Sequence, residues 1–557
     1  MRSFSWKRAV GAPAAALLAL GGAAFAVVGT GSPAGATTTV HDAAELQAAF
    51  NSDETVIILA NDISVTTRIL RDNTHNGDVV IEGAGFTITS DGSDRIFEDR
   101  GTGRLELQNI TLTGGVIDSD GGAVAARGDV IVSNATFTDN HATDGYGGAI
   151  VSETNVTSDG STFDNNTSYD SGGAIAAGED VTVKNGSSFT GNAAESDGGA
   201  VYSEAGLVDI SGSTFTNNQA DANLGGYGDG GAAFSFNRMI VAGSTFSGNF
   251  TTSEQDAGGG AVEAIGTLDV SDSTFTGNAA NLVGGALYGA DDTTIARSTF
   301  TGNCAAYGGA IEHNIGPAPE GNDQPEEGTT ALSIVNSTIT ANTQNSGDSA
   351  IGAFGATTEI AYSTIVGNIN DDSSDCGLPA LESGAAAAEH RSAKAGAAGT
   401  VHARAGFEDG VNLVVINDVT LFGNVIAGPV GGPNCFVEEG SNLTSQGYNF
   451  SDDSSCDLTN ATDKVATPND PQLNALGPWG GPTDTMLPFT PLHGGVTSPL
   501  IDAIPAAACQ TGIATGVTTD QRGVTRPQLV GCDIGAVEVT GAEYQVEAAV
   551  VTPRFTG

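Results

Sequence analysis

The stretch "SGSTFTNNQADANLGGYGDGGAAF", residues 211–234, contains the two short patterns that decide the fold. In the first, a phenylalanine stands three positions before an asparagine, and in the second a glycine pair precedes small residues. Both patterns return along the chain, and the first four phenylalanines are spaced by 26 residues. The phenylalanines are Phe137, Phe163, Phe189, Phe215, Phe246, Phe275 and Phe300, and the asparagines that follow them are Asn140, Asn166, Asn192, Asn218, Asn249, Asn278 and Asn303.

A fixed period of this size marks a stacked repeat, in which each unit buries its apolar face only against its neighbours. The unit that begins at Gly172 divides into three strand-like pieces, "GGAIAA", "DVTVKN" and "SSFTGN". No piece is long enough for a crossover helix, and Val181-Thr182-Val183 alternates with the period of two typical of a strand. Three strands and about 26 residues per coil predict an all-β chain folded as a right-handed parallel β-helix.

Stacking of the coils places like residues on like residues, which explains the repeated letters. We expect the phenylalanines to form an interior aromatic column. The asparagines should form a hydrogen-bonded ladder at a bend. The glycine pairs should form a corner at which neighbouring coils approach closely.

The composition restricts the partners of the protein. The chain has 557 residues, with 79 glycines but only 3 methionines and 2 tryptophans, which favours short strands over helices. Lys and Arg number 19 against 66 Asp and Glu, for a formal net charge of -47. A surface this acidic excludes nucleic acid, whose binding requires basic groups, and argues against docking on anionic lipid. It attracts divalent cations.

Six segments follow one another along the chain. Residues 1–36 have the charged start, apolar run and small-residue end of a secretory signal peptide, so we expect a secreted or cell-surface protein. Residues 37–54 form an N-terminal cap, in which a helix begins after Asp42 with Glu45 at the capping-box position. The β-helix repeats span 55–376, an Ala-rich low-complexity insertion spans 377–412, the C-terminal coils and a closing region span 413–540, and a tail spans 541–557. After signal cleavage we expect no membrane-spanning segment.

Six cysteines fit an oxidising destination, and none lies in a C-x-x-C pair. We expect neighbours to pair, Cys435 with Cys456 and Cys509 with Cys532, with Cys304–Cys376 as a third disulfide. The sequence by itself does not fix this connectivity. Four of the six cysteines lie after residue 430, so we expect disulfides to cross-link the C-terminal closing region.

Two known families resemble parts of the chain. From Gly121 to Asn303 the alternation of G-G-A-[IVL] with F-x-x-N resembles the repeats of the chlamydial polymorphic outer-membrane proteins, which are surface-exposed β-helices associated with adhesion. The C-terminal part resembles the choice-of-anchor Q domain of bacterial surface proteins through "GYNFSDDSSC" (447–456), "DPQLNALGPWGGPTDTMLP" (470–488), "SPLIDA" (498–503), "TDQRGVTRP" (519–527) and "CDIGAVE" (532–538). The chain shows no recognisable anchor after this part.

Charged pairs are expected to lock the closing region. Arg522 and Arg526 are two of few cations in the chain, and they lie near Asp520 and Asp533 in the sequence. Partly buried pairs of arginine and carboxylate would hold this region in place.

Two functions agree with these observations. The first is a non-enzymatic adhesin, binding or structural surface protein without a cofactor, whose partner is an extracellular polysaccharide, a cell wall or a host-surface ligand. The second is a polysaccharide lyase or glycoside hydrolase, which needs paired carboxylates or a base beside bound calcium. Acid pairs occur at Asp291-Asp292, Asp371-Asp372 and Asp452-Asp453, but no Gly-His-Gly with a later Arg-Ile-Lys accompanies them. We therefore favour the adhesin and assign no catalytic residue.

A stripe of aspartates forms the one metal hypothesis. Each member lies within about three residues before a glycine pair, so stacking would align them: Asp120, Asp144, Asp170, Asp197, Asp229 and Asp256. Like charges on neighbouring strands destabilise a sheet, and bound Ca²⁺ would relieve their repulsion. The alternative is that aspartate favours turns and that these side chains point into water.

Overall fold

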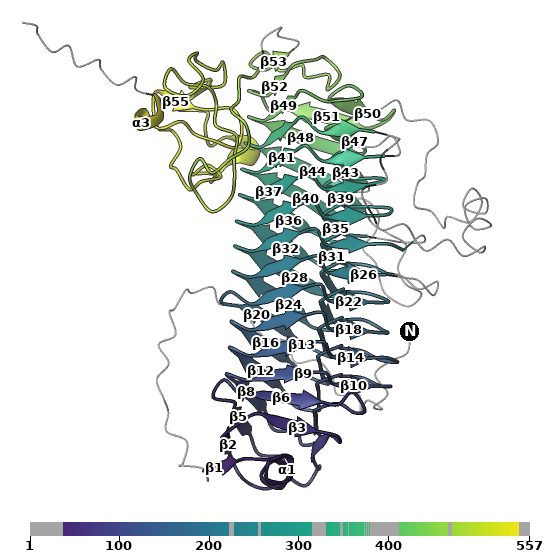
Figure 1. The fold of residues 1–557 in the computed structure, drawn as a ribbon. Coiled ribbons are helices and arrows are strands. Elements are labelled where there is room, and N and C mark those ends of the chain that lie inside the picture. Colours follow the sequence, from purple (N-terminus) through teal and green to yellow (C-terminus); the bar gives the residue numbers. More distant parts are fainter. Residues whose placement is uncertain are drawn as a thin grey trace, which may run out of the picture.

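The fold is a right-handed parallel β-helix of about 13 turns, with ~26 residues per turn and very little helix (Figure 1). This computed structural model describes residues 37–221, 228–253, 258–314, 330–345, 349–354, 356–371, 374, 376, 378, 411–465 and 470–544. The repeat period in the sequence therefore predicted the architecture correctly.

Three long parallel sheets run along the stack, and a shorter fourth sheet accompanies its middle. Within the described residues, sheet A has 15 strands, from β1 (Thr37–Val40) to β51 (Asn442–Ser445). Sheet B has 15 strands, from β3 (Ile63–Val65) to β53 (Lys464–Val465). Sheet C has 13 strands, from β4 (Ile69–Arg71) to β50 (Cys435–Val437), and sheet D has ten, from β10 (Val116–Ile117) to β46 (Ile369–Asn370).

One central coil shows how the chain visits the four sheets. It contributes β19 (Ile175–Ala177) to sheet C, β20 (Val181–Lys184) to sheet A, β21 (Ser188–Thr190) to sheet B and β22 (Ala193–Ala194) to sheet D. The first three are the strands that the sequence predicts. The fourth follows the buried Asn192, and its two residues are too few to show the alternation by which a strand is recognised in a sequence.

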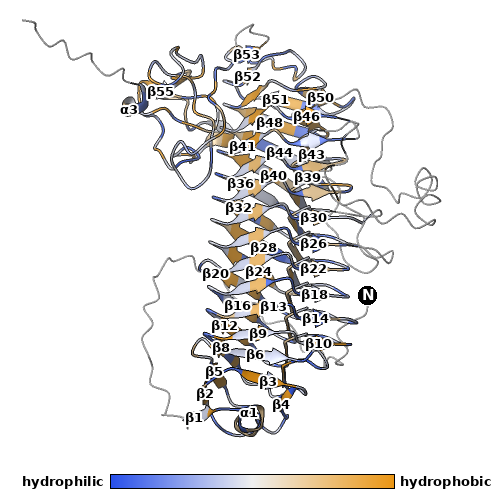
Figure 2. Cartoon of the chain, in the orientation of Figure 1, coloured by the Kyte–Doolittle hydropathy of each residue, from blue (hydrophilic) through white to orange (hydrophobic). Residues whose placement is uncertain are grey.

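The phenylalanines form the predicted column inside the helix. Phe163, Phe189 and Phe215 lie in register on successive strands of sheet B, and all are fully buried. Along the column from Phe137 to Phe300, adjacent ring centroids are 4.6 to 4.9 Å apart and the rings are within 6° of parallel. The packing combines apolar burial with stacking of aromatic rings. Figure 2 shows apolar residues along the stacked strands and hydrophilic residues at the turns.

The asparagines form a continuous buried ladder. Nδ2 of Asn192 donates to Oδ1 of Asn218 at 3.0 Å and to the carbonyl oxygen of Phe163 at 3.1 Å. The same pattern connects every asparagine of the repeat, and it continues through Asn342 and Asn368 to two further residues, Asn412 and Asn434. Each buried amide therefore has a partner, which buried polar groups require.

The glycine pairs meet two separate geometric demands at the corner before sheet C. Gly147 has a φ of 64°, in the left-handed region that glycine adopts without strain. A Cβ atom on Gly148 would lie 2.1 Å from the carbonyl oxygen of Gly173 in the next coil. Neither position accepts a side chain, so the pair recurs in every coil of this region.

A short helix covers the N-terminal end of the stack. Helix α1 (Ala43–Phe50) begins after Asp42, whose Oδ1 accepts a hydrogen bond from the Glu45 backbone N–H at 2.9 Å. Leu46, Ala49 and Phe50 are buried against the first coil. In Figure 1 the helix lies at the purple end, where it protects an otherwise open edge.

The C-terminal region packs beside the last coils. In Figure 1 this yellow part flanks the stack. Oε1 of Gln521 accepts a hydrogen bond from the hydroxyl of Thr338 in sheet B at 2.7 Å, and the hydroxyl of Tyr362 donates to the carbonyl oxygen of Cys509 at 2.6 Å. The three disulfides join the pairs named in the sequence analysis: Cys304–Cys376, Cys435–Cys456 and Cys509–Cys532.

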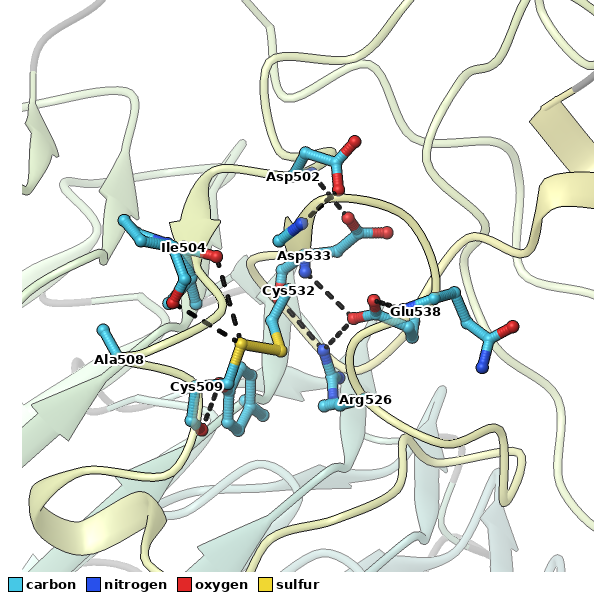
Figure 3. Close-up of a disulfide and its surroundings, with 12 residues drawn as sticks. Asp502, Ile504, Ala508, Cys509, Arg526, Cys532, Asp533 and Glu538 are labelled. Atoms are coloured by element: carbon cyan, nitrogen blue, oxygen red, sulfur yellow. Dashed lines mark hydrogen bonds and ion pairs between the residues drawn. A yellow bond between two sulfur atoms is a disulfide. The ribbon is translucent and has the colours of Figure 1, made fainter.

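A buried ion network lies next to the last disulfide (Figure 3). The sequence led us to expect Arg526 near the Asp533 carboxylate, but its ion pair is with Glu538, at 3.0 Å, and both side chains are fully buried. Arg526 also donates to the carbonyl oxygen of Asp533 at 3.0 Å. The Asp533 carboxylate instead accepts backbone N–H groups, and burial together with the Glu538 charge raises its pKa. Arg522 pairs with Asp520 at 3.0 Å, as expected.

Candidate functional site

A charged groove lies on the outer side of sheet C near the N-terminal end of the stack. One wall is formed by β7 (Phe97–Asp99), β11 (Val124–Ala126), β15 (Ile150–Ser152) and the residues that flank them. Residues 117–120, at the end of and after β10, also line the groove. The groove has a volume of about 260 Å³. Pockets for drug-sized ligands span about 300–1,000 Å³, so this groove suits one small chemical unit.

The groove is lined by several of the few basic side chains of the protein. Its lining contains four of the 19 Lys and Arg residues: Arg68, Arg95, Arg100 and Arg127. It also contains five of the 66 Asp and Glu residues: Glu98, Asp99, Asp118, Asp120 and Glu153. The two signs are nearly balanced here, whereas the chain as a whole is strongly acidic. A groove of this kind can bind a ligand that carries charge.

Two of the arginines are held by the same glutamate. Arg68 contacts Glu98 at 2.5 Å through Nη1 and Asp94 at 3.0 Å through Nε. Nε of Arg100 donates to the other oxygen of Glu98 at 2.6 Å. Burial would raise the pKa of Glu98, but hydrogen bonds from the two arginines outweigh it and lower that pKa. These three side chains therefore form a closed structural cluster.

Two more carboxylates in the wall face arginines of their own. Asp99 lies 3.3 Å from Nη1 of Arg71, and both side chains are almost fully buried. Burial raises the pKa of Asp99, although Arg71 acts in the opposite direction. Oε1 of Glu153 lies 3.6 Å from Nε of Arg127. Both carboxylates are therefore engaged by arginines of the protein itself.

Arg95 differs from the other arginines of the groove. The register that places Phe97 opposite Val124 puts Arg95 opposite Gly122, the second member of the first glycine pair. Arg95 is only 6% exposed, its Nε has no hydrogen-bond partner, and no carboxylate among the described residues forms an ion pair with it. Burial lowers the pKa of Arg95. Because an unpaired buried charge is costly, this guanidinium is the prime candidate for contact with a ligand.

Residues 117–120 offer carboxylate oxygens to the groove. Asp118 is exposed at the rim, and no hydrogen bond joins its side chain to the described residues. Asp120 is half-buried, and its Oδ1 accepts the backbone N–H of Tyr146 at 3.0 Å. Burial raises the pKa of Asp120, and the positive charge of Arg95 counteracts this. The groove therefore holds one cation and two carboxylates that the wall does not neutralise by direct contact.

The aspartate stripe is distributed along the corner above the groove. Asp120 lies in the groove, Asp144 is exposed, and Asp256 is outside the described residues. Oδ1 of Asp229 accepts the backbone N–H of Gly258 in the next coil at 3.0 Å, the same arrangement as that of Asp120 with Tyr146. In the part of the chain that the structure describes, no three His, Cys, Asp or Glu side chains gather as a metal site. The calcium hypothesis for the stripe stays a prediction.

Asp170 and Asp197 lie over an aromatic cluster on the outer face of sheet C. This cluster contains Tyr202 and Phe234, whose rings stack at 5.9 Å. The hydroxyl of Tyr146 bonds to the Asp170 carboxylate. Burial, with a further contribution from the Asp170 charge, raises the pKa of Asp197 to about 7.

The acid pairs proposed for catalysis are engaged in turns and coil contacts. Oδ1 of Asp292 accepts the Ala331 backbone N–H at 2.8 Å. Asp452 and Asp453 both bind Asn434, through its side chain and its backbone N–H respectively. Asp372 lies outside the described residues. The described pairs therefore act as structural hydrogen-bond acceptors.

No sequence pattern predicted the groove. Its residues come from four successive coils, and only Asp120 was singled out. A signal was present, because Arg68, Arg71, Arg95, Arg100 and Arg104 lie close together in a chain with 19 basic residues. The repeat pattern identifies only residues that recur from coil to coil. Arg95 does not recur, because later coils have glycine at its position.

Comparison with known proteins gives two family matches. Residues 37–194 match the model of a pectate lyase-like adhesive domain, and residues 186–204 match the Chlamydia polymorphic membrane protein repeat. No curated protein matches the chain, and no solved structure matches it. All residues that line the groove lie inside the first match. The chain is therefore similar to surface-exposed, adhesive β-helix proteins, and no helix among its described residues is long and apolar enough to cross a membrane.

Proposed function

We propose that this protein is an exported, non-enzymatic adhesin that binds an extracellular polysaccharide, a cell wall or a host surface through its N-terminal coils. The observation that carries the proposal is the coincidence of the groove with the segment that matches an adhesive domain, residues 37–194. Residues 1–36 supply the export signal. The resemblance of the C-terminal part to the choice-of-anchor Q domain supports a surface location.

The long stack suits this role because a solenoid presents a groove on a rigid scaffold. The parallel pairing of β7, β11 and β15 in sheet C holds the groove residues in place, so a ligand meets preorganised groups. Preorganisation reduces the entropic cost of binding. The C-terminal region lies at the other end of the stack from the groove, which leaves the N-terminal coils accessible when the C-terminal end is held at a surface.

The test is a binding assay of the purified protein on acidic and neutral polysaccharides, isolated cell walls and host extracellular material, with and without Ca²⁺. Retention on one class of material, without release of unsaturated products or reducing ends, is the expected result. Release of such products would replace the adhesin by a lyase or hydrolase. Failure to bind any of these materials would remove the adhesive function.

A further inference from the structure

We propose that the groove binds the zwitterionic group of an α-amino acid, with the carboxylate at Arg95 and the ammonium group at Asp118 and Asp120. The inference deepens the proposed function, because it names the chemistry that the adhesive coils would recognise on a surface. It can be tested with small molecules and does not require an adhesion assay.

Arg95 forms the carboxylate subsite. Among the arginines of the groove, Arg68, Arg100 and Arg127 each lie against a carboxylate of the wall. Arg95 lines the same groove, is 6% exposed and forms no ion pair with the described residues. A guanidinium presents a planar set of donors that matches a carboxylate. A ligand carboxylate is therefore the group that this buried cation lacks.

Asp118 and Asp120 form the ammonium subsite. Asp118 and Asp120 lie in the lining segment 117–120, and the charge of Asp120, after that of Glu98, acts on Arg95 without a direct contact. Asp120 uses only Oδ1, for the Tyr146 backbone N–H, and Asp118 uses neither oxygen within the described part of the chain. A carboxylate placed at Arg95 would be repelled by these two groups unless the ligand also carried a cation. A zwitterion matches both the arginine and the two aspartates.

Size and polarity restrict the ligand further. The volume of about 260 Å³ suits a small unit, and Ile117, Ala125 and Val151 provide aliphatic surface for a short side chain. The lining contains no aromatic ring that could lie flat against a sugar. A polyanionic polymer would meet the acidic rim and the net charge of -47. These features favour an amino acid group over a sugar acid.

The experiment is titration of the full protein, followed by calorimetry, with four probes: alanine, N-acetylalanine, alaninamide and glucuronate. Alanine carries both charges, whereas N-acetylalanine lacks the ammonium group and alaninamide lacks the carboxylate. We expect saturable binding of alanine and at least about tenfold weaker binding of the other three, since each loses one charge-assisted contact. Preference for glucuronate, equal binding of N-acetylalanine, or no binding of any probe would overturn the proposal.

Variants locate the site. Arg95→Met and Asp118→Asn should each weaken alanine binding about tenfold or more. Arg238→Met is the matched control, because Arg238 is an exposed arginine whose ion pair with Asp269 lies outside the groove. Asp118 is exposed, so its substitution keeps the test valid even if Arg95→Met fails to fold. Alanine binding that is unchanged in Asp118→Asn and in a folded Arg95 variant would refute the assignment.

The amino acid group could be free or attached to a polymer. A γ-glutamyl peptide, whose free α-amino and α-carboxyl groups form such a zwitterion at its end, separates the two sources. Binding of the peptide as tightly as alanine indicates a surface-borne ligand, and binding of alanine alone indicates a free amino acid. Alanine binding without adhesion to any surface would keep this inference and remove the adhesin. Adhesion without alanine binding would do the reverse.

Discussion

The guanidinium of Arg526 lies 4.1 Å from the centroid of the Tyr362 ring, so a cation of the C-terminal region rests on an aromatic residue of the β-helix. Tyr362 is fully buried, and its hydroxyl donates to the carbonyl oxygen of Cys509. Arg526 meanwhile pairs with Glu538 inside its own region. A single arginine thus joins the internal network of the C-terminal region to the wall of the stack, through cation–π and ionic contacts.

Removal of one partner from this network should loosen the C-terminal region. Glu538→Gln leaves the buried Arg526 without its carboxylate, and breaking a buried ion pair in this way costs about 3–5 kcal/mol. We expect a lower thermal midpoint and faster hydrogen exchange in residues 470–544. Arg238→Met breaks a half-exposed pair with Asp269 and should cost at most about 1 kcal/mol. Equal effects of the two variants would contradict the structural role of the network.

The asparagine ladder predicts a large cost for one interior substitution. Asn192→Ala removes the two hydrogen bonds donated by its Nδ2, and it leaves Asn166 without the Oδ1 atom to which its amide and backbone N–H groups donate. Each orphaned buried group costs about 1–3 kcal/mol, so we expect destabilisation by at least about 3 kcal/mol in denaturant titration. Asn73→Ala, at an exposed position, serves as the control. Equal destabilisation by the two substitutions would contradict a stabilising role of the buried ladder.

Asp197 predicts a pH dependence of stability. Its pKa in the fold is raised from 3.8 to about 7, so the folded state keeps a proton that the unfolded chain releases. The resulting stability is complete below about pH 4 and is lost as the pH rises through about 7. Asp197→Asn should therefore raise the thermal midpoint at pH 8 relative to the wild type, with a much smaller difference at pH 4. Asp144→Asn changes the exposed member of the stripe and should show no such pattern.

The aspartate stripe gives a direct test with calcium. Asp120 and Asp229 each use one oxygen for a backbone N–H of the next coil, so hydrogen bonding already holds them in place. If these hydrogen bonds alone hold the stripe, the thermal midpoint is the same with Ca²⁺ and with a chelator. A midpoint that rises with Ca²⁺ and falls on chelation would establish the stripe as a cation site, because oxygen ligands of this kind suit calcium.

The architecture was predictable because contacts in a stacked repeat are encoded by spacing. Phe163 meets Phe189 because each holds the same position in its coil, and the same holds for Asn166 and Asn192. The serine ladder was not foreseen, although it follows the same rule: the backbone N–H of Ser161 donates to the hydroxyl of Ser187 at 3.3 Å. Because serine also occurs at many other positions of the chain, the regular spacing of the ladder serines does not stand out in the sequence.

The groove could not be predicted in the same way, since it depends on departures from the repeat. Arg95 occupies the place of a glycine, and the residues that line the groove with it come from four coils that the sequence does not order in space. The ion-pair partner of each groove arginine also had to be known. Only the contacts of Arg68, Arg100 and Arg127 with their carboxylates reveal that Arg95 is the groove arginine without an ion pair.

The register of the coils makes the length of the rod adjustable. Asn192 and Asn218 hold equivalent positions in consecutive coils, so deletion of residues 193–218 would join two matching points of the chain and leave every sheet in register. We expect the shortened protein to fold, with its two ends closer by one interstrand spacing of ~4.8 Å, a change that small-angle scattering can follow. Evolution can therefore set how far the groove stands from the C-terminal region by adding or removing whole coils, without redesigning either end.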